Sequence, residues 1–290
     1  MRPEDLPFAP DAFAPPATRP PVRVTWLGTA GFAIEHDGTT VLIDPYVTRA
    51  SLWSCVRAPL ASDAAAVARW APRADAIVTG HTHFDHALDV PAIARATGAT
   101  VYGSRSCAAL CRIDGVPDGR VVDVESALRG EPVRAQVGPF ALRFVPSAHS
   151  ALLLGRIPFP GEIADCDQVP MRAQRYRCGA VFGVEITVAG KRLYHLGSAN
   201  LVDAQRVPGV DLLLMCVAGW TSTRDFPTRV LSAFAPGAIL LSHWDDFFRP
   251  MEAGARPLPA LAFPRLVDAL GAAGRDVRLG TVPIGGTVAL

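Results

Sequence analysis

The order of apolar segments along the chain most constrains its fold, because the same succession occurs twice. Residues 22–27, 32–35 and 40–44 alternate between apolar and polar side chains around short turns, which predicts an opening β-meander. Strand-like and helix-like segments alternate after it, and then a second antiparallel group and a second alternation follow. Two sheets with helices on their outer faces would bury such strands on both sides, so the sequence predicts an α/β fold, a four-layer αββα sandwich.

The segments behind this prediction differ in period and in length. Helix-like periodicity occupies 62–70, 89–96, 104–111 and about 258–272, whereas strand-like runs occupy 76–79, 100–102, 133–136, 141–145, 181–188, 192–196, 211–215 and 238–241.

One domain is expected over residues 22–290, preceded by a proline-rich arm at 1–21 whose prolines prevent a helix or a central strand. The stretch at about 151–179 is long and lacks clear periodicity, so we interpret it as a lid-like insertion. The arm has no apolar h-region, and no later run reaches the length of a transmembrane helix. We therefore expect a cytoplasmic protein without a membrane span.

The charge balance excludes partners that depend on a strong electrostatic field. The 290 residues include 28 basic and 27 acidic side chains, for a formal net charge of +1. Such a chain has no long-range field to attract nucleic acid, but its charge does not identify a partner. A small-molecule substrate is expected from the metal-binding motif described below. The proline-rich arm could pack on a neighbouring copy, which leaves a homo-oligomer open.

Three histidines and one aspartate lie within six residues, directly after the strand-like run at 76–79. His81 and His83 point to one side of an extended turn and can share one metal ion. Asp85 and His86 follow where the chain curls toward a helix, and they can reach a second ion. Imidazole and carboxylate ligands suit Zn²⁺, Fe or Mn²⁺. Four such groups are costly to hold together without a partner, so the run predicts a metal site instead of a polar turn.

Other histidines follow predicted strands, at the ends where side chains from separate elements converge. His149 comes after the strand at 141–145, and we assign it to the first metal. His243 comes after the strand at 238–241, and we assign it to the second. His195 lies inside an alternating strand, where a buried histidine behind the ligands is expected, and His36 lies in a predicted surface turn.

The run from His81 to His86, followed by distant single histidines, resembles the metallo-β-lactamase fold superfamily over most of the chain from Val22 onward. The resemblance implies that Asp44, at the end of an early strand, orients a ligand imidazole from behind. The stretches 26–31 and 243–248 are similar to the branch that contains ascorbate-phosphate lactonases and enzymes of the N-acyl-phosphatidylethanolamine phospholipase D type.

The chain departs from the superfamily pattern after the strand at 192–196. Most such hydrolases place a Gly-Asp pair there whose carboxylate bridges the metals, but here the pair is Gly197-Ser198. Some metallo-β-lactamases resemble this set, with serine at the place of the third ligand. We expect two divalent ions with Ser198 behind the ligands, and the alternative is a second site that fills weakly or not at all.

The expected reaction is cleavage of an ester-type bond, in a small or lipid-like substrate, by a metal-bound hydroxide. A divalent metal lowers the pKa of its bound water toward ~7 and polarises the substrate oxygen that it contacts. Asp85 would hold the attacking water and pass its proton to the leaving group. Zn²⁺ is favoured, with Mn²⁺ or Fe as alternatives, and phosphodiesters, lactones and thioesters all stay open as substrates.

Two other functions fit the same motif. A degenerate mononuclear member could bind a ligand without turnover, and an iron-dependent redox enzyme could use the same fold. The substrate-binding residues are unknown from the sequence. Arginines in and around the insertion are the candidates for an anionic group, namely Arg156, Arg172, Arg175 and Arg177.

Overall fold

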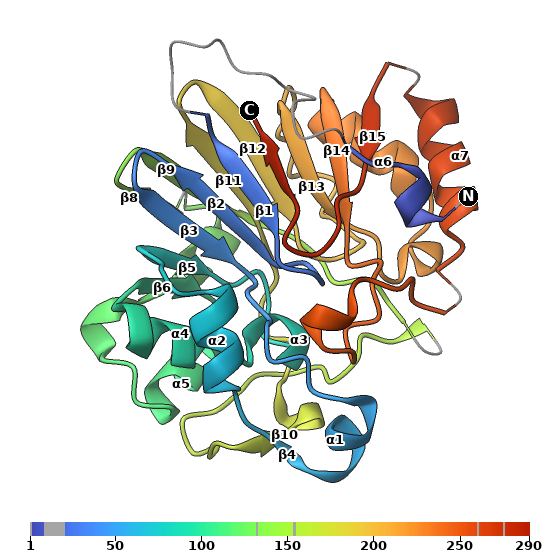
Figure 1. Ribbon diagram of the computed structural model, residues 1–290. Helices are drawn as coiled ribbons and strands as arrows, with labels where there is room; N and C mark the ends of the chain where they lie inside the picture. The colour runs from blue at the N-terminus through green and yellow to red at the C-terminus, as the bar shows by residue number, and fades with distance from the viewer. Residues whose placement is uncertain (1, 9–20, 132, 153–154, 260, 275) are drawn as a thin grey trace.

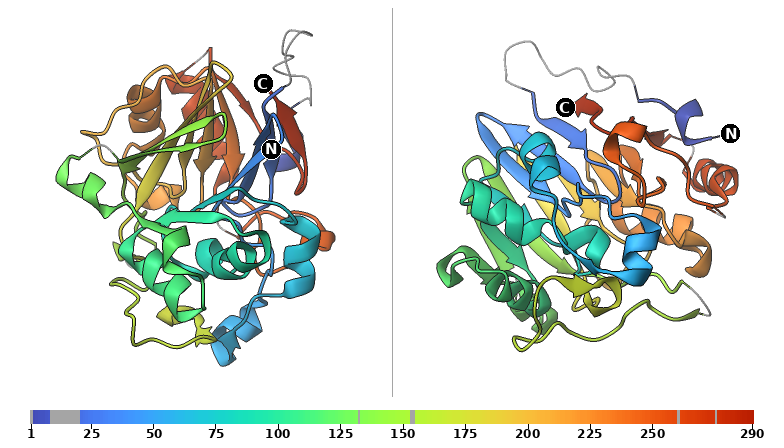
Figure 2. Two further views of the ribbon diagram at one scale, coloured as in Figure 1. Left: turned by 90° about the vertical axis from the view of Figure 1, so that its left-hand side faces the viewer. Right: turned by 60° about the horizontal axis from the view of Figure 1, so that its bottom comes forward.

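The computed structural model describes residues 2–8, 21–131, 133–152, 155–259, 261–274 and 276–290. Two seven-stranded sheets form its centre, and a short two-stranded sheet lies apart from them (Figure 1). Helices cover the outer face of each large sheet, as the turned views show (Figure 2). The predicted αββα sandwich is therefore confirmed.

The first sheet combines an antiparallel half with a parallel half. Strands β16, β1, β2 and β3 pair antiparallel, and the neighbours from β3 to β7 pair parallel. Its strands, in sheet order, are β16 (Thr287–Ala289), β1 (Arg23–Trp26), β2 (Phe32–His36), β3 (Thr39–Ile43), β5 (Ala76–Val78), β6 (Thr100–Gly103) and β7 (Val121–Asp123).

The second sheet repeats this division. Strands β8, β9, β11 and β12 pair antiparallel, and those from β12 to β15 pair parallel. Its strands, in sheet order, are β15 (Arg278–Gly280), β14 (Ala238–Ser242), β13 (Leu212–Cys216), β12 (Lys191–Leu196), β11 (Phe182–Val188), β9 (Phe140–Pro146) and β8 (Val133–Val137). Parallel strands bring their carboxyl ends to one edge, where loops can combine side chains into a site.

Apolar packing joins the four layers. One buried cluster fills the space between the sheets and continues beneath α6 (Phe226–Phe234) and α7 (Phe263–Ala273). A second cluster lies on the outer face of the first sheet, beneath α2 (Ala64–Trp70), α4 (Val90–Thr97) and α5 (Arg105–Ile113). No helix in the described ranges is long and apolar enough to cross a membrane.

A third buried cluster lies at the end of the sandwich that carries α1 (Leu52–Arg57) and α3 (Phe84–Ala87) (Figure 1). It joins these helices to the 163–176 segment, whose β10 (Met171–Arg172) pairs with β4 (Pro59–Leu60). This part of the predicted insertion therefore packs on the domain. Its action as a lid stays a prediction.

The described part of the N-terminal arm lies on the second sheet. Residues 3–5 form a 3₁₀ turn, and the backbone groups of Leu6 and Phe8 bond to Thr281 at distances of 2.7 and 2.8 Å. The ring of Phe8 occupies the space that a side chain at Gly280 would take, since a Cβ there would lie 2.4 Å from Phe8 Cδ2. Residues 9–20 of the arm lie outside the described residues.

Burial on the inner face of the second sheet should dominate stability. Ile186 on β11 is fully buried in the core, whereas Thr187 beside it is exposed. Ile186→Ala removes apolar contacts and leaves a cavity, so the free energy of unfolding should fall by about 2–5 kcal/mol. Thr187→Ala, the matched control on the same strand, should change it by about 0.5 kcal/mol or less. Urea unfolding measures both, and equal effects would contradict this assignment of the core.

Candidate metal centre

Two strand ends of the first sheet shape the run that begins at His81. Gly80, just past β5, donates its backbone N–H to Oδ1 of Asp44 at 2.6 Å, and Asp44 follows β3 directly. His83 keeps an extended backbone at the N-cap of α3, and the helix starts at Phe84. The first two histidines therefore leave an extended segment, whereas Asp85 and His86 leave the first helical turn.

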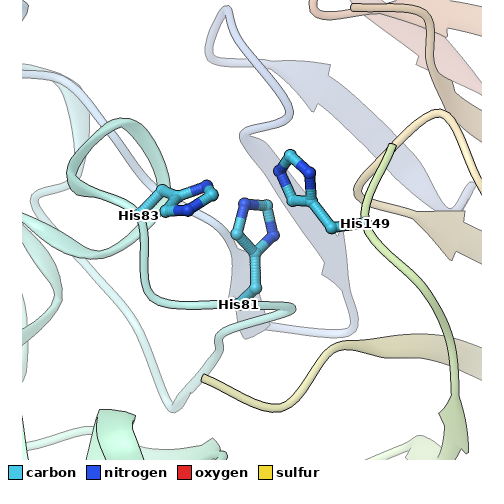
Figure 3. Close-up of side chains that lie close together, drawn as sticks. All are labelled: His81, His83 and His149. Carbon is cyan, nitrogen blue, oxygen red and sulfur yellow. The ribbon is translucent and has the colours of Figure 1, made fainter. Parts of the chain in front are cut away.

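His81, His83 and His149 form the first cluster, and their ligand atoms lie within 4.8 Å of one another. The three imidazoles converge from the loop after β5 and the segment after β9 (Figure 3). Nε2–H of His83 donates to the carbonyl of Pro158 at 2.8 Å, and Nδ1–H of His149 donates to the carbonyl of Ser150 at 2.7 Å. Each bond fixes a tautomer and leaves the other ring nitrogen with a free lone pair.

Asp85, His86 and His243 form the second cluster, also with ligand atoms within 4.8 Å of one another. Oδ2 of Asp85 lies 3.2 Å from Nε2 of His243 and 3.7 Å from Nε2 of His86. The two clusters adjoin, because the rings of His81 and His86 have centroids 3.8 Å apart. The structure thus brings together all six predicted ligands, from three separate segments of the chain.

Asp44 lies behind this pair of clusters, fully buried and with a left-handed backbone at φ +44°. Its Oδ2 accepts the Nδ1–H of His86 at 2.9 Å, which turns Nε2 of His86 toward Asp85. His195 lies beside it, with Nε2 3.9 Å from the same oxygen and hydrogen-bonded to the carbonyl of Ala30 at 2.9 Å. Asp44 and His195 therefore lie where side chains behind the ligands were expected.

Burial and charge move the pKa values of the ligands in opposite directions. Burial lowers the pKa of His81, which its histidine neighbours lower further, and lowers that of His149 to about 3. Burial raises the pKa of Asp85, but the charge of His86 and the hydrogen bond from His243 outweigh it and lower the value. For His86 burial lowers the pKa, and the carboxylates of Asp44 and Asp85 outweigh it and raise the value.

The donors present fit a divalent metal ion. Within the part of the chain that the structure describes, both ring nitrogens of His81 are buried without a hydrogen-bond partner, and so is Nδ1 of His243. Buried imidazole nitrogens without partners are costly, and a metal ion would engage the lone pair of one nitrogen in each ring. Neutral imidazoles with one carboxylate form a donor set typical of Zn²⁺ and of other first-row metals.

Ser198 stays outside the three groups of potential ligands among the described residues. Its hydroxyl accepts the backbone N–H of Ser150 at 3.0 Å, so it supports the loop that carries His149. Asp203 does not replace the missing carboxylate, because it is exposed and paired with Arg229 at 2.8 Å.

The candidate arginines do not reach the clusters through any contact that the structure shows. Arg175 pairs with Asp167, while Arg172 and Arg177 donate to backbone carbonyls at 3.2 and 3.5 Å, and Arg156 is exposed. His36 is the last residue of β2, so its placement in a turn was wrong, and it lies away from the centre with Nδ1 3.4 Å from the carbonyl of Pro21.

Sequence reasoning missed an aromatic border beside the ligands. Phe247 lies edge-on to His243 at 5.2 Å between ring centroids, and it continues to Phe84 and Phe248 at 6.2 and 4.4 Å. Phe159 lies 6.2 Å from His83 on the other side. The Phe247-Phe248 pair, four residues after His243, was the available signal.

Known proteins similar to this chain include metal hydrolases. Residues 39–244 match the family described as the beta-lactamase superfamily domain. The chain is 30% identical over 242 residues to a metal-dependent hydrolase from Anaeromyxobacter sp. (strain K), an alignment that covers 80% of this chain and 78% of that protein.

Two solved structures share the fold. A metallo hydrolase from the archaeon Ignicoccus hospitalis has a TM-score of 0.54 at 17% identity, over 93% of this chain and 98% of that one. A diiron β-hydroxylase from Streptomyces venezuelae has a TM-score of 0.58 at 16% identity, over 95% of this chain and 55% of that one. At such identities the likeness concerns the fold alone.

The buried histidines should make the metal-free protein sensitive to acid. The unfolded chain protonates His149 near its ordinary pKa of 6.5, whereas the folded protein keeps it neutral down to about pH 3. Protonation therefore favours unfolding as the pH falls through this window. His86 contributes with the opposite sign, since its pKa is raised and its contribution is lost as the pH rises. The variant His149→Gln removes the contribution of His149 to this acid sensitivity. In EDTA, its unfolding temperature should therefore fall less between about pH 7 and about pH 5 than that of the wild type. An equal fall in both proteins would refute this.

Proposed function

Because the chain belongs to the beta-lactamase superfamily domain family and is a metal-dependent hydrolase, we propose that it holds two divalent metal ions and cleaves an ester-type bond. His81, His83 and His149 would hold the first ion, and Asp85, His86 and His243 the second. Zn²⁺ is the favoured metal, with Mn²⁺ or Fe as alternatives. The observation that carries the proposal is the pair of adjoining three-ligand clusters, in which His81 and His243 have ring nitrogens without a hydrogen-bond partner among the described residues.

Divalent ions bound there would activate water at neutral pH and polarise the substrate oxygen. Asp85 is the group suited to hold and move the proton. Its pKa is lowered, although burial raises it, because the charge of His86 and the His243 hydrogen bond outweigh the burial, so the carboxylate is anionic and can accept a hydrogen bond from the attacking water. From the same place it can return a proton to the leaving group. Asp44 keeps the Nδ1–H of His86 engaged and so maintains the tautomer that faces the second site.

The border of the clusters supports a small or lipid-like substrate with an apolar part. Phe247 lies against His243, and Phe159 lies near His83, so apolar surface flanks the ligands on two sides. Leu152 and Ile157, on the segment that continues from His149 toward Pro158, are 37% and 39% exposed. Apolar walls around a few convergent polar groups are typical of small-molecule sites. Phosphodiesters, lactones and thioesters with an apolar group are the substrates to test.

A mononuclear centre is the second candidate, and Ser198 favours it. The second cluster contains one carboxylate, and the end of β12 supplies a hydroxyl that is already bonded to Ser150. Fewer negative ligands weaken the binding of a second dication. A chain with one ion could still hydrolyse or could bind a ligand without turnover.

Removal of either histidine at the start of the run should abolish both bound metal at the first site and turnover. His81→Ala and His83→Ala each leave two of three ligands, so elemental analysis should show loss of about one equivalent or more. His36→Ala is the matched control, since this histidine lies away from the centre and should retain full metal content. Unchanged metal content in either site variant would refute the ligand assignment.

The phenylalanine side chains beside the ligands should affect substrate binding more than the rate of the chemical step. With bis-p-nitrophenyl phosphate, lactones and acyl thioesters of increasing chain length, Phe247→Ala should raise KM for the longest substrates by about 10-fold and change kcat little, because uniform binding is lost. Thr187→Ala serves as the exposed control. A fall in kcat that is equal for short and long substrates would contradict this role.

A further inference from the structure

Arg49 and Asp245 form an ion pair inside the domain, with side chains 1% and 0% exposed and an Nη1 to Oδ2 distance of 2.7 Å. Every other arginine–carboxylate pair found in the described ranges leaves its arginine at least a quarter exposed. Burial of two charges carries a desolvation cost that can exceed their attraction. The pair therefore needs a reason other than stability.

Asp245 lies two residues after His243, and its carboxylate closes a ring of contacts around that histidine. Oδ1 of Asp245 accepts the backbone N–H of Thr29 at 2.9 Å. The carbonyl of Thr29 accepts the backbone N–H of His243 at 2.7 Å. The loop that carries His243 is thus bonded at two points to the 28–31 turn, and Arg49 holds the other oxygen of the carboxylate.

The backbone at these places is unfavourable for side chains with a Cβ. Thr29, Arg49 and His243 have φ values of +51°, +53° and +57°. Non-glycine residues persist in this region when surrounding contacts over-determine them. Gly28 is required for a different reason, because a Cβ there would lie 1.6 Å from Nη2 of Arg49. The 28–31 turn is therefore shaped to admit the guanidinium.

The segment that carries Arg49 also carries Asp44, so one stretch of chain is linked to both histidines of the second cluster, directly to His86 and through Asp245 to His243. Asp44 bonds to His86 at 2.9 Å, and Arg49 reaches His243 through Asp245. Asp89 fixes the stretch between them, because its Oδ2 accepts the backbone N–H groups of Val47 and Thr48 at 2.7 and 2.8 Å. One loop therefore holds the imidazole of His86 directly and the backbone of His243 through Asp245 and Thr29.

We propose that the Arg49–Asp245 pair is a positioning device that holds His243 with its ring toward Asp85 and so sets the affinity of the second metal site. This rests on the two-metal centre proposed above. Neither residue belongs to the clusters of potential ligands in the described part of the chain. The pair acts through the backbone of His243, whose Nε2 lies 3.2 Å from Asp85.

Asp245→Asn tests the proposal, because the amide keeps the size of the side chain and removes its charge. In Zn²⁺ titrations of metal-free protein by calorimetry, the affinity for the second equivalent should fall about 10–100-fold, and the first should stay within about twofold. Arg49→Lys keeps the charge without the planar fork and should lie between this variant and the wild type. Glu185→Gln, which removes a carboxylate from an ion pair on β11, is the matched control and should bind as the wild type does.

A double variant separates positioning from folding. Arg49→Met with Asp245→Leu removes both charges, so no uncompensated charge stays buried, and the protein should fold as judged by circular dichroism. It should still lose affinity for the second equivalent alone. Wild-type affinity at both sites in this variant, or equal loss at both sites in a folded variant, would overturn the proposal.

A separate measurement distinguishes failure of the positioning device from failure of the two-metal centre. The imidazole ¹⁵N signals of metal-free protein should change for His243 in Asp245→Asn and stay unchanged for His149. If wild-type protein binds only one equivalent of Zn²⁺, the two-metal centre fails, and these signals still decide the role of the pair. Unchanged His243 signals would reject it.

Discussion

The carboxylate of Asp44 connects the fold to the metal centre. It accepts the N–H of Gly80 from the end of β5 and the Nδ1–H of His86 from α3, and both bonds form where water is excluded. The first bond sets where the His81 run leaves the sheet, and the second sets which nitrogen of His86 faces Asp85. An apolar side chain at this place would leave a buried amide and a buried imidazole without acceptors, which is costly in a dry interior. Asp44 thus fixes the start of the His81 run and the orientation of His86.

Burial prepares the same groups for a cation before one is bound. Five of the six predicted ligands are imidazoles, and the pKa values of His81, His83 and His149 are lowered by burial, so these rings are neutral donors at neutral pH. Asp85 is anionic because neighbouring imidazoles and a hydrogen bond outweigh its own burial. Protons compete poorly for these four groups, so a metal ion that needs deprotonated ligands does not have to displace protons from them. His86 is the exception, because the carboxylates of Asp44 and Asp85 raise its pKa. A bound cation would compensate the remaining cost of holding these groups together in the interior.

The αββα sandwich and the run of potential metal ligands could be predicted from the sequence, because both depend on local patterns. Burial on both faces makes β13 and β14 continuous apolar runs, and six close residues reveal the His81 motif. It did not reveal α6, whose Phe, Thr and Val are poor helix formers and which is stabilised by packing on the second sheet. The three-residue edge strand β16 is too short to show alternation. The Arg49–Asp245 pair joins residues 196 positions apart, and no local pattern encodes such a contact.

Ser198, which replaces the usual bridging carboxylate, and the buried Arg49–Asp245 pair both bear on how tightly the second cluster would bind a metal ion. Without a bridging carboxylate, the second cluster offers one negative ligand to a dication, and Ser198 is engaged in holding the His149 loop instead. Charge then contributes less to the second site, and the site depends more on how well its imidazoles are oriented beforehand. The loop at 44–50 supplies that orientation from both of its ends, through Asp44 to His86 and through Arg49 and Asp245 to His243. A site poor in carboxylate gains most from a rigid second layer, because disorder in a ligand has to be removed before the metal binds.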